Sequence, residues 1–88
     1  MPRYHFYYCD SSRDLDTTGT ELAGDQAAQH AAIAFAGEVL RFSPTTLWDR
    51  GHWRIEVTDA EGMLLFTILT LAINAPKPIR RKPVGAND

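Results

Sequence analysis

The sequence lacks the common motifs of catalytic, cofactor and metal sites. It has one cysteine, Cys9, and no closely spaced pair of Cys and His of the kind that holds zinc. It also has no glycine-rich phosphate loop and no calcium loop with a glycine at the sixth position. We therefore expect no enzyme activity, no catalytic residue, no cofactor and no metal. Cys9 is expected to be a small buried residue.

Long apolar runs are also missing. The longest is MLLFTILTLAI at 63–73, which has 11 residues, whereas a membrane-spanning helix needs about 20. The polar, aromatic start MPRYHFYYCD does not resemble a signal peptide. One unpaired cysteine fits a reducing compartment. These features predict a cytoplasmic protein with no membrane partner.

Acidic residues are almost absent from the end of the chain. Residues 1–76 carry ten acidic and five basic side chains, a net charge of −5, whereas residues 77–88 carry one acidic and four basic, a net charge of +3. Clustered cations can bind nucleic-acid phosphates. The alternative is that the tail keeps the chain soluble or docks on its own acidic body. The candidate phosphate contacts are Lys77, Arg80, Arg81 and Lys82.

The composition is that of a globular protein, because 44% of the 88 residues are hydrophobic and 23% are charged. We expect one domain at 1–73. The segment 74–88, NAPKPIRRKPVGAND, has three prolines and no periodicity, so we expect a disordered basic tail there.

Aromatic residues dominate the first segment, where RYHFYYCD at 3–10 predicts a strand. Its two faces carry Tyr4, Phe6 and Tyr8 on one side and His5, Tyr7 and Cys9 on the other. Residues 10–20 are rich in Asp, Ser, Thr and Gly and predict a loop, with a short strand around Leu15 as an option.

An alanine-rich helix is predicted from Asp25, its expected N-cap, to the Ser43-Pro44 pair that ends it. The periodicity gives this helix an apolar face that can pack on a sheet. The residues of that face are Ala28, Ala32, Phe35, Ala36, Val39, Leu40 and Phe42.

Two further strands are predicted after a loop at 44–52. In WRIEVT at 53–58 the apolar residues alternate with polar ones, and Asp59–Gly62 has the composition of a tight hairpin turn. Whether Val57 faces Leu64 or Leu65 depends on a bulge that the sequence leaves open. The expected fold is a small α+β domain of β-α-β-β order, a three-stranded, mainly antiparallel sheet with the helix on one face.

The third strand, 63–71, is apolar on both of its faces. One helix covers one face, so we expect this strand at the centre of the sheet, flanked by the other two, with its second face against a partner. A two-fold homodimer is the commonest solution. The candidate self-association residues are Met63, Leu65, Leu69 and Leu71.

Several motifs together resemble a family of short bacterial proteins classed only as a domain of unknown function. They are the start MPRYHF, GTEL at 19–22, the alanine-rich helix and RIEVTDAEG at 54–62. The chain departs from the family at YYCDSS, 7–12, and in its basic tail. The resemblance implies a compact α+β protein and brings no activity with it.

Two hypotheses for function follow from these observations. The first is a non-enzymatic interaction module that self-associates through its sheet. The alternative is a nucleic-acid-associated regulator that uses the basic tail.

Overall fold

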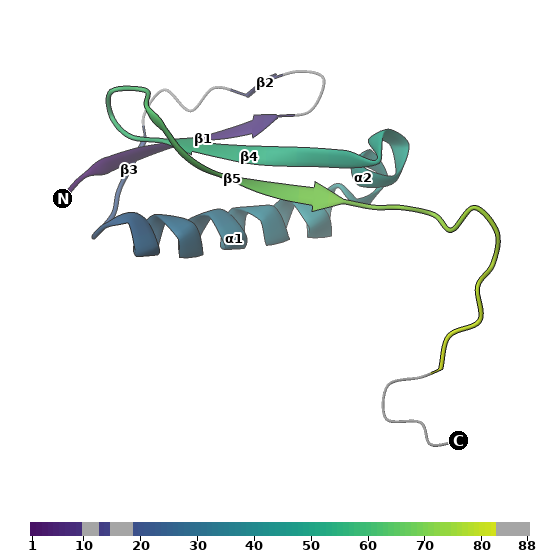
Figure 1. Cartoon of the computed structure of the whole chain (residues 1–88). Helices are drawn as coiled ribbons and strands as arrows, with labels where there is room; N and C mark the ends of the chain where they lie inside the picture. The colour runs from purple at the N-terminus through teal and green to yellow at the C-terminus, as the bar shows by residue number, and fades with distance from the viewer. Residues whose placement is uncertain (10–12, 15–18, 83–88) are drawn as a thin grey trace.

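A twisted sheet lies over a long helix in the computed structural model of the chain, which describes residues 1–9, 13–14 and 19–82 (Figure 1). The strands are β1 (Arg3–Cys9), β2 (Arg13–Asp14), β3 (Thr20–Glu21), β4 (His52–Thr58) and β5 (Leu64–Leu71). The helices are α1 (Asp25–Phe42) and α2 (Pro44–Arg50). The expected α+β class is confirmed, with one more helix and two more short strands than predicted.

The strand order is β2-β1-β4-β5, all antiparallel, with β3 also paired to β1. The prediction that the third long strand, β5, is central is therefore wrong, because β4 is central and β5 is an edge strand. An apolar row on each face is typical of a doubly buried strand. In β5 the outer row is exposed instead.

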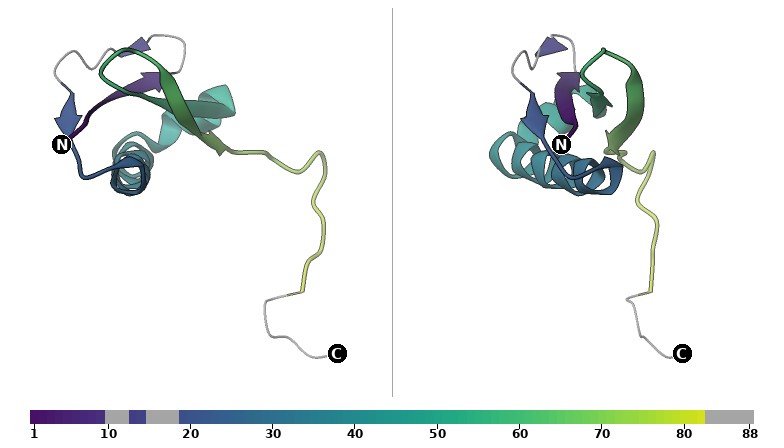
Figure 2. Two further views of the ribbon diagram at one scale, coloured as in Figure 1. Left: turned by 60° about the vertical axis from the view of Figure 1, so that its left-hand side comes forward. Right: turned by 90° about the vertical axis from the view of Figure 1, so that its left-hand side faces the viewer.

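The core lies between α1 and the inner face of the sheet, which is the face toward the helix in both views of Figure 2. The inner row of β4 is fully buried, and Ala28 and Ala32 of α1 are fully buried beneath the sheet. Small side chains allow the helix to approach the sheet closely, so the large side chains come from the strands. The fully buried β4 residues are Trp53, Ile55 and Val57.

The predicted bounds of the long helix are confirmed, but its N-cap is not. Gly24 is the N-cap, and Asp25 is the first helical residue and makes no capping hydrogen bond. Its carboxylate instead accepts a hydrogen bond from the hydroxyl of Tyr4, with an oxygen–oxygen distance of 2.7 Å. Asp25 therefore joins the start of α1 to β1.

The apolar face of α1 is shorter than predicted. Ala28, Ala32 and Ala36 are buried and Val39 packs against the core, but Phe42 is 73% exposed. Leu40 is also exposed. The last turn of α1 therefore lies outside the buried contact with the sheet.

The predicted loop at 44–52 is largely helix α2. Pro44 is at its first turn, where the missing backbone N–H costs nothing and the fixed φ angle suits a helix. Gly51 ends it with a φ of 86° and donates its N–H to the carbonyl of Leu47 at 2.7 Å. The proline that ends α1 thus also begins α2.

The hairpin between β4 and β5 is confirmed. The side chain of Asp59 accepts hydrogen bonds from the backbone N–H of Glu61 and of Met63, each at 2.9 Å, and Gly62 has a φ of 84°. Val57 pairs with neither Leu64 nor Leu65.

The pairing of Val57 is displaced by an irregularity in the ladder. Thr58 pairs with Leu64, whereas Val57 pairs with Phe66, so the register shifts between these two residues. The extra residue on β5 is a bulge beyond the turn.

Two predictions concern segments at the margins of the described residues. The optional strand around Leu15 lies outside them. Residues 74–82 form no helix or strand and extend away from the sheet (Figure 1).

The tight approach of α1 to the sheet gives a test of the fold. Ala32→Leu adds volume at a fully buried position, so we expect the free energy of unfolding to fall by about 1–3 kcal/mol in urea denaturation. Ala34 is exposed on the same helix, and Ala34→Leu should leave stability nearly unchanged. Equal effects of the two changes would contradict this packing.

The bond between Tyr4 and Asp25 predicts a loss of stability at high pH. This hydrogen bond first, then burial and the nearby negative charge, raise the pKa of the Tyr4 hydroxyl above its usual value of about 10. The hydrogen bond therefore makes its full contribution to the free energy of unfolding below about pH 10. This contribution is lost as the pH rises through the folded-state pKa of Tyr4, because the hydroxyl of the unfolded chain loses its proton at a lower pH.

Urea denaturation across this pH range measures the effect. Tyr4→Phe should show a smaller fall in the free energy of unfolding than the parent chain. Tyr7→Phe keeps the Tyr4–Asp25 bond and serves as the control. A Tyr4→Phe profile that matches the parent would show that this bond carries no alkaline sensitivity.

Candidate self-association surface

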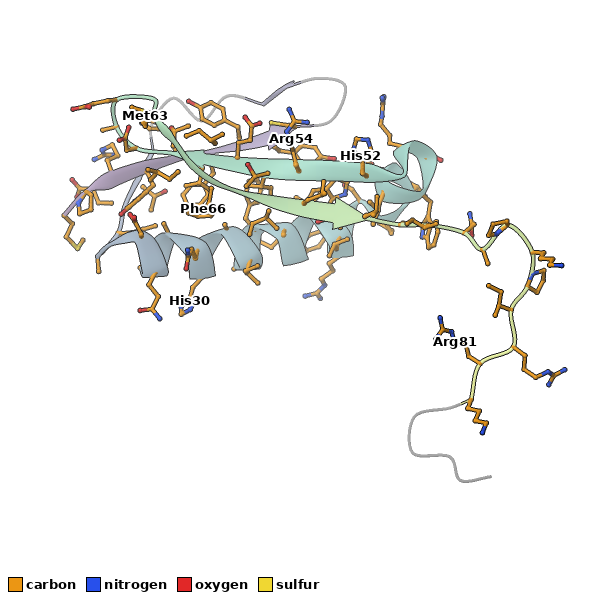
Figure 3. The ribbon with its side chains drawn as sticks, viewed as in Figure 1. His30, His52, Arg54, Met63, Phe66 and Arg81 are labelled. Carbon is orange, nitrogen blue, oxygen red and sulfur yellow. The ribbon has the colours of Figure 1, made fainter. Side chains whose placement is uncertain are left out.

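The outer face of the sheet, on the side away from α1, has no helix of the described residues against it (Figure 2). In Figure 3 the side chain of Phe66 lies between β5 and α1, whereas Arg54 rises from the other side of the sheet. Pairing places Leu69 beside Arg54 and Leu71 beside His52 on that outer face. The β5 side chains of this face therefore point away from the core.

The four sequence-predicted self-association residues are all exposed. Their exposed fractions are 66% for Met63, 37% for Leu65, 64% for Leu69 and 57% for Leu71. The alternate row of the same strand is different, because Phe66 and Ile68 pack against the core. The prediction that one apolar row of this strand faces away from the helix is confirmed.

Leu64 was missing from the predicted set. The shifted register pairs it with Thr58, and Thr58 pairs in turn with His5 of the outer row of β1. Leu64 is 54% exposed. Alternation alone assigns it to the inner row, so only the bulge, which has no distinct sequence signal here, brings it to the outer side. We call Met63, Leu64, Leu65, Leu69 and Leu71 the β5 apolar surface.

A charged pair on β4 borders this surface. The guanidinium Nε of Arg54 donates to Oε2 of Glu56 at 2.9 Å. This hydrogen bond is the largest cause of the raised pKa of Arg54, and the negative charge of Glu56 raises it further. Because the two charges neutralise each other within one chain, a partner can cover the flank without supplying a counter-charge.

The backbone edge of β5 is also open. Among the described residues, β5 pairs with β4 on one side and with no strand on the other. Edge strands are usually protected by charged side chains, proline or bulges. Residues 63–73 contain no charge and no proline, and the bulge affects only the first residues of β5. The stretch from Phe66 to Leu71 therefore presents a regular, uncharged edge.

Other candidate sites have less support. Within residues 1–9, 13–14 and 19–82, no group of three His, Cys, Asp or Glu side chains could hold a metal ion. Cys9 is buried, and its thiol lies 3.8 Å from the carbonyl oxygen of Tyr7. The indole N–H of Trp53 is buried with no hydrogen-bond partner in the described part of the chain.

An apolar groove of about 240 Å³ lies between α1 and the strands β1 and β3. Its lining consists of Phe6, Thr20, Ala31 and Phe35. Among the described residues of that lining, Thr20 supplies the single polar side chain, and one hydroxyl by itself does not make a site for acid–base or nucleophilic chemistry.

The predicted phosphate contacts lie on a separate segment that follows the β5 apolar surface. Residues 77–82 are all exposed on an extended segment, and Figure 3 shows Arg81 well away from the sheet and α1. The structure therefore separates the two predicted sets of site residues.

Comparison with known proteins gives one match. The family model of a domain of unknown function (DUF6894) matches residues 3–72. No curated protein and no solved structure matches the chain. The described helices include none that is both long enough and apolar enough to span a bilayer.

Proposed function

We propose that the protein, whose chain belongs to the DUF6894 family, is a non-enzymatic interaction module that forms a homodimer through β5. The family is described as a domain of unknown function and has no assigned activity. The observation that carries the proposal is an edge strand that is open along its backbone and apolar on its outer side. The partner is a second copy of the chain, whose β5 adds antiparallel to the first.

The two edges of the sheet support a closed dimer rather than a filament. On the edge opposite β5, β1 is paired with β3 at Arg3 and Tyr4 and with β2 at Tyr8 and Cys9. That edge is occupied near both ends, whereas β5 has eight residues available. Contact of β5 with β5 uses the same surface in both copies and closes after two.

The size of the apolar surface is sufficient only when the edge takes part. Two side chains of this surface, Leu69 and Leu71, lie in the regular part of β5, and together they equal about 1.2 fully exposed ones. Their burial contributes roughly 2–4 kcal/mol per copy at about 1.5–3 kcal/mol per side chain. Association itself costs about 4–15 kcal/mol. Backbone hydrogen bonds between the two strands, at about 0.5–1.5 kcal/mol each, favour the dimer further.

The strand geometry restricts the register of the pair. Side chains that face each other across an antiparallel pair lie on the same side of the sheet, whereas neighbouring residues of one strand lie on opposite sides. A residue therefore cannot pair with its neighbour's position in the second copy, and the two-fold axis must lie at a residue that pairs with itself. An axis at Leu69 keeps the pairing within the regular segment from Phe66 to Ala72 and beyond the bulge. It places Leu69 against its own copy and Thr67 against Leu71 of the second copy.

A charge at the axis should separate the copies. Leu69→Glu removes apolar contact from both copies and puts two like charges face to face, so we expect the dimer to weaken by about 100-fold or more. Sedimentation velocity over a concentration series measures this. Ile33→Glu makes the same charge change at a 57% exposed position on α1 and should leave the dimer intact.

Three results would overturn the proposal. One is a strictly monomeric parent chain at high micromolar concentration. Another is equal weakening by the two variants. The third is a stable complex of β5 with an extended segment of another protein in place of the second copy, since an open edge also accepts such a strand.

Cross-linking tests the register. In a Cys9→Ala background, Leu69→Cys should form an intermolecular disulfide under mild oxidation, because the two thiols face each other across the axis. Thr67→Cys should cross-link far more slowly. Each Thr67 lies two positions from the axis and faces Leu71 of the second copy, so the two introduced thiols are not opposite each other. Cross-linking of Thr67→Cys in preference to Leu69→Cys would contradict the axis at Leu69. Non-reducing electrophoresis measures both.

A further inference from the structure

We propose that the basic arm, defined as residues 77–82, binds the sugar-phosphate backbone of nucleic acid. This binding is separate from self-association. Four of its six residues are cationic, and no acidic residue lies between Glu61 and Asp88. The arm also lies beyond the family match, which ends at residue 72. It is therefore outside the part of the chain that the family model matches.

The position of the arm leaves its charge available. It leaves the fold after β5 and runs clear of the sheet and of both helices (Figures 1 and 3). Lys77, Arg80 and Arg81 are exposed and form no ion pair within residues 1–9, 13–14 and 19–82. The acidic side chains of the described body thus do not pair with these three cations of the arm.

The chemistry of the arm fits phosphates on an extended polymer. Pro76 and Pro78 restrict the backbone to extended conformations. Arg80 and Arg81 can each donate two parallel hydrogen bonds to a phosphate group. The body carries a net charge of −5 over residues 1–76 and repels a polyanion, so contact is confined to the arm.

An anionic membrane is a poorer partner for the same charges. Stable attachment to a membrane takes a second signal besides a basic cluster, such as an acyl chain or an apolar anchor. Ile79 is the single large apolar side chain between Asn74 and Lys82. Nucleic-acid binding needs no such anchor, because the release of counterions supplies the free energy.

Fluorescence anisotropy with the full chain tests the proposal. The probes are a labelled oligothymidylate and a labelled DNA duplex, each titrated at several salt concentrations. With up to four phosphate contacts, the slope of log K against log salt should approach about −3 for the single strand and −3.6 for the duplex. Arg80→Ala/Arg81→Ala should halve both slopes.

A matched variant controls for total charge. Arg41→Ala/Arg50→Ala removes two exposed cations from the helices and should leave the slopes unchanged. Equal losses from the two double variants would overturn the arm as the site, as would absence of binding at low salt. Vesicles rich in phosphatidylserine are the third probe. Binding to these vesicles without binding to either DNA would also overturn the proposal.

The dimer and the arm can fail independently. Leu69→Glu and Ile33→Glu carry the same net charge, and only the first is expected to separate the copies. Equal salt slopes for these two variants would support an arm that acts in each copy alone. A slope that vanishes in Leu69→Glu and persists in Ile33→Glu would overturn that independence.

Discussion

The contact between one alanine-rich helix face and the inner row of β4 determines the rest of this structure. Ala28 and Ala32 are fully buried under Ile55 and its neighbours, so α1 lies close to the sheet. One helix of 18 residues can cover only one face. The apolar side chains of β5 on the opposite face are then exposed or meet a partner. The outer row of β5 is the part of the sheet where this constraint has its largest effect, because its leucines have no described element over them.

Local signals explain which parts of the fold were predictable. Three features each depend on residues that are close together in sequence. Helix periodicity and the following proline predict the bounds of α1. An Asp and a Gly at turn positions predict the turn at Asp59–Gly62, and strict alternation predicts the inward row of β4. That one apolar row of the third strand faces away from the helix was predictable for the same reason. The family was identified from short motifs, and the match to residues 3–72 confirms it.

Features that depend on distant residues were not predictable. An apolar row on both faces of β5 is compatible with burial at the centre of a sheet or with exposure at an edge, and pairing of β1 with β4 decides between them. Asp25 has a typical N-cap side chain, yet Tyr4, 21 residues away, takes its carboxylate. The bulge that adds Leu64 to the outer face arises from strand pairing and not from a turn motif.

The last part of the chain combines two surfaces with opposite physical dependence on salt. From Met63 to Ile73 it is uncharged, whereas four of the six residues from Lys77 to Lys82 are cationic. Association of apolar surfaces is hardly weakened by screening and is strengthened by sulfate and similar salts. Contact of cations with phosphate weakens at higher salt, because the release of counterions then contributes less free energy. Ionic strength should therefore move the two proposed interactions of this short segment in opposite directions. Since β5 leads directly into the arm, any partner strand on β5 lies close to the start of the arm without sharing its chemistry.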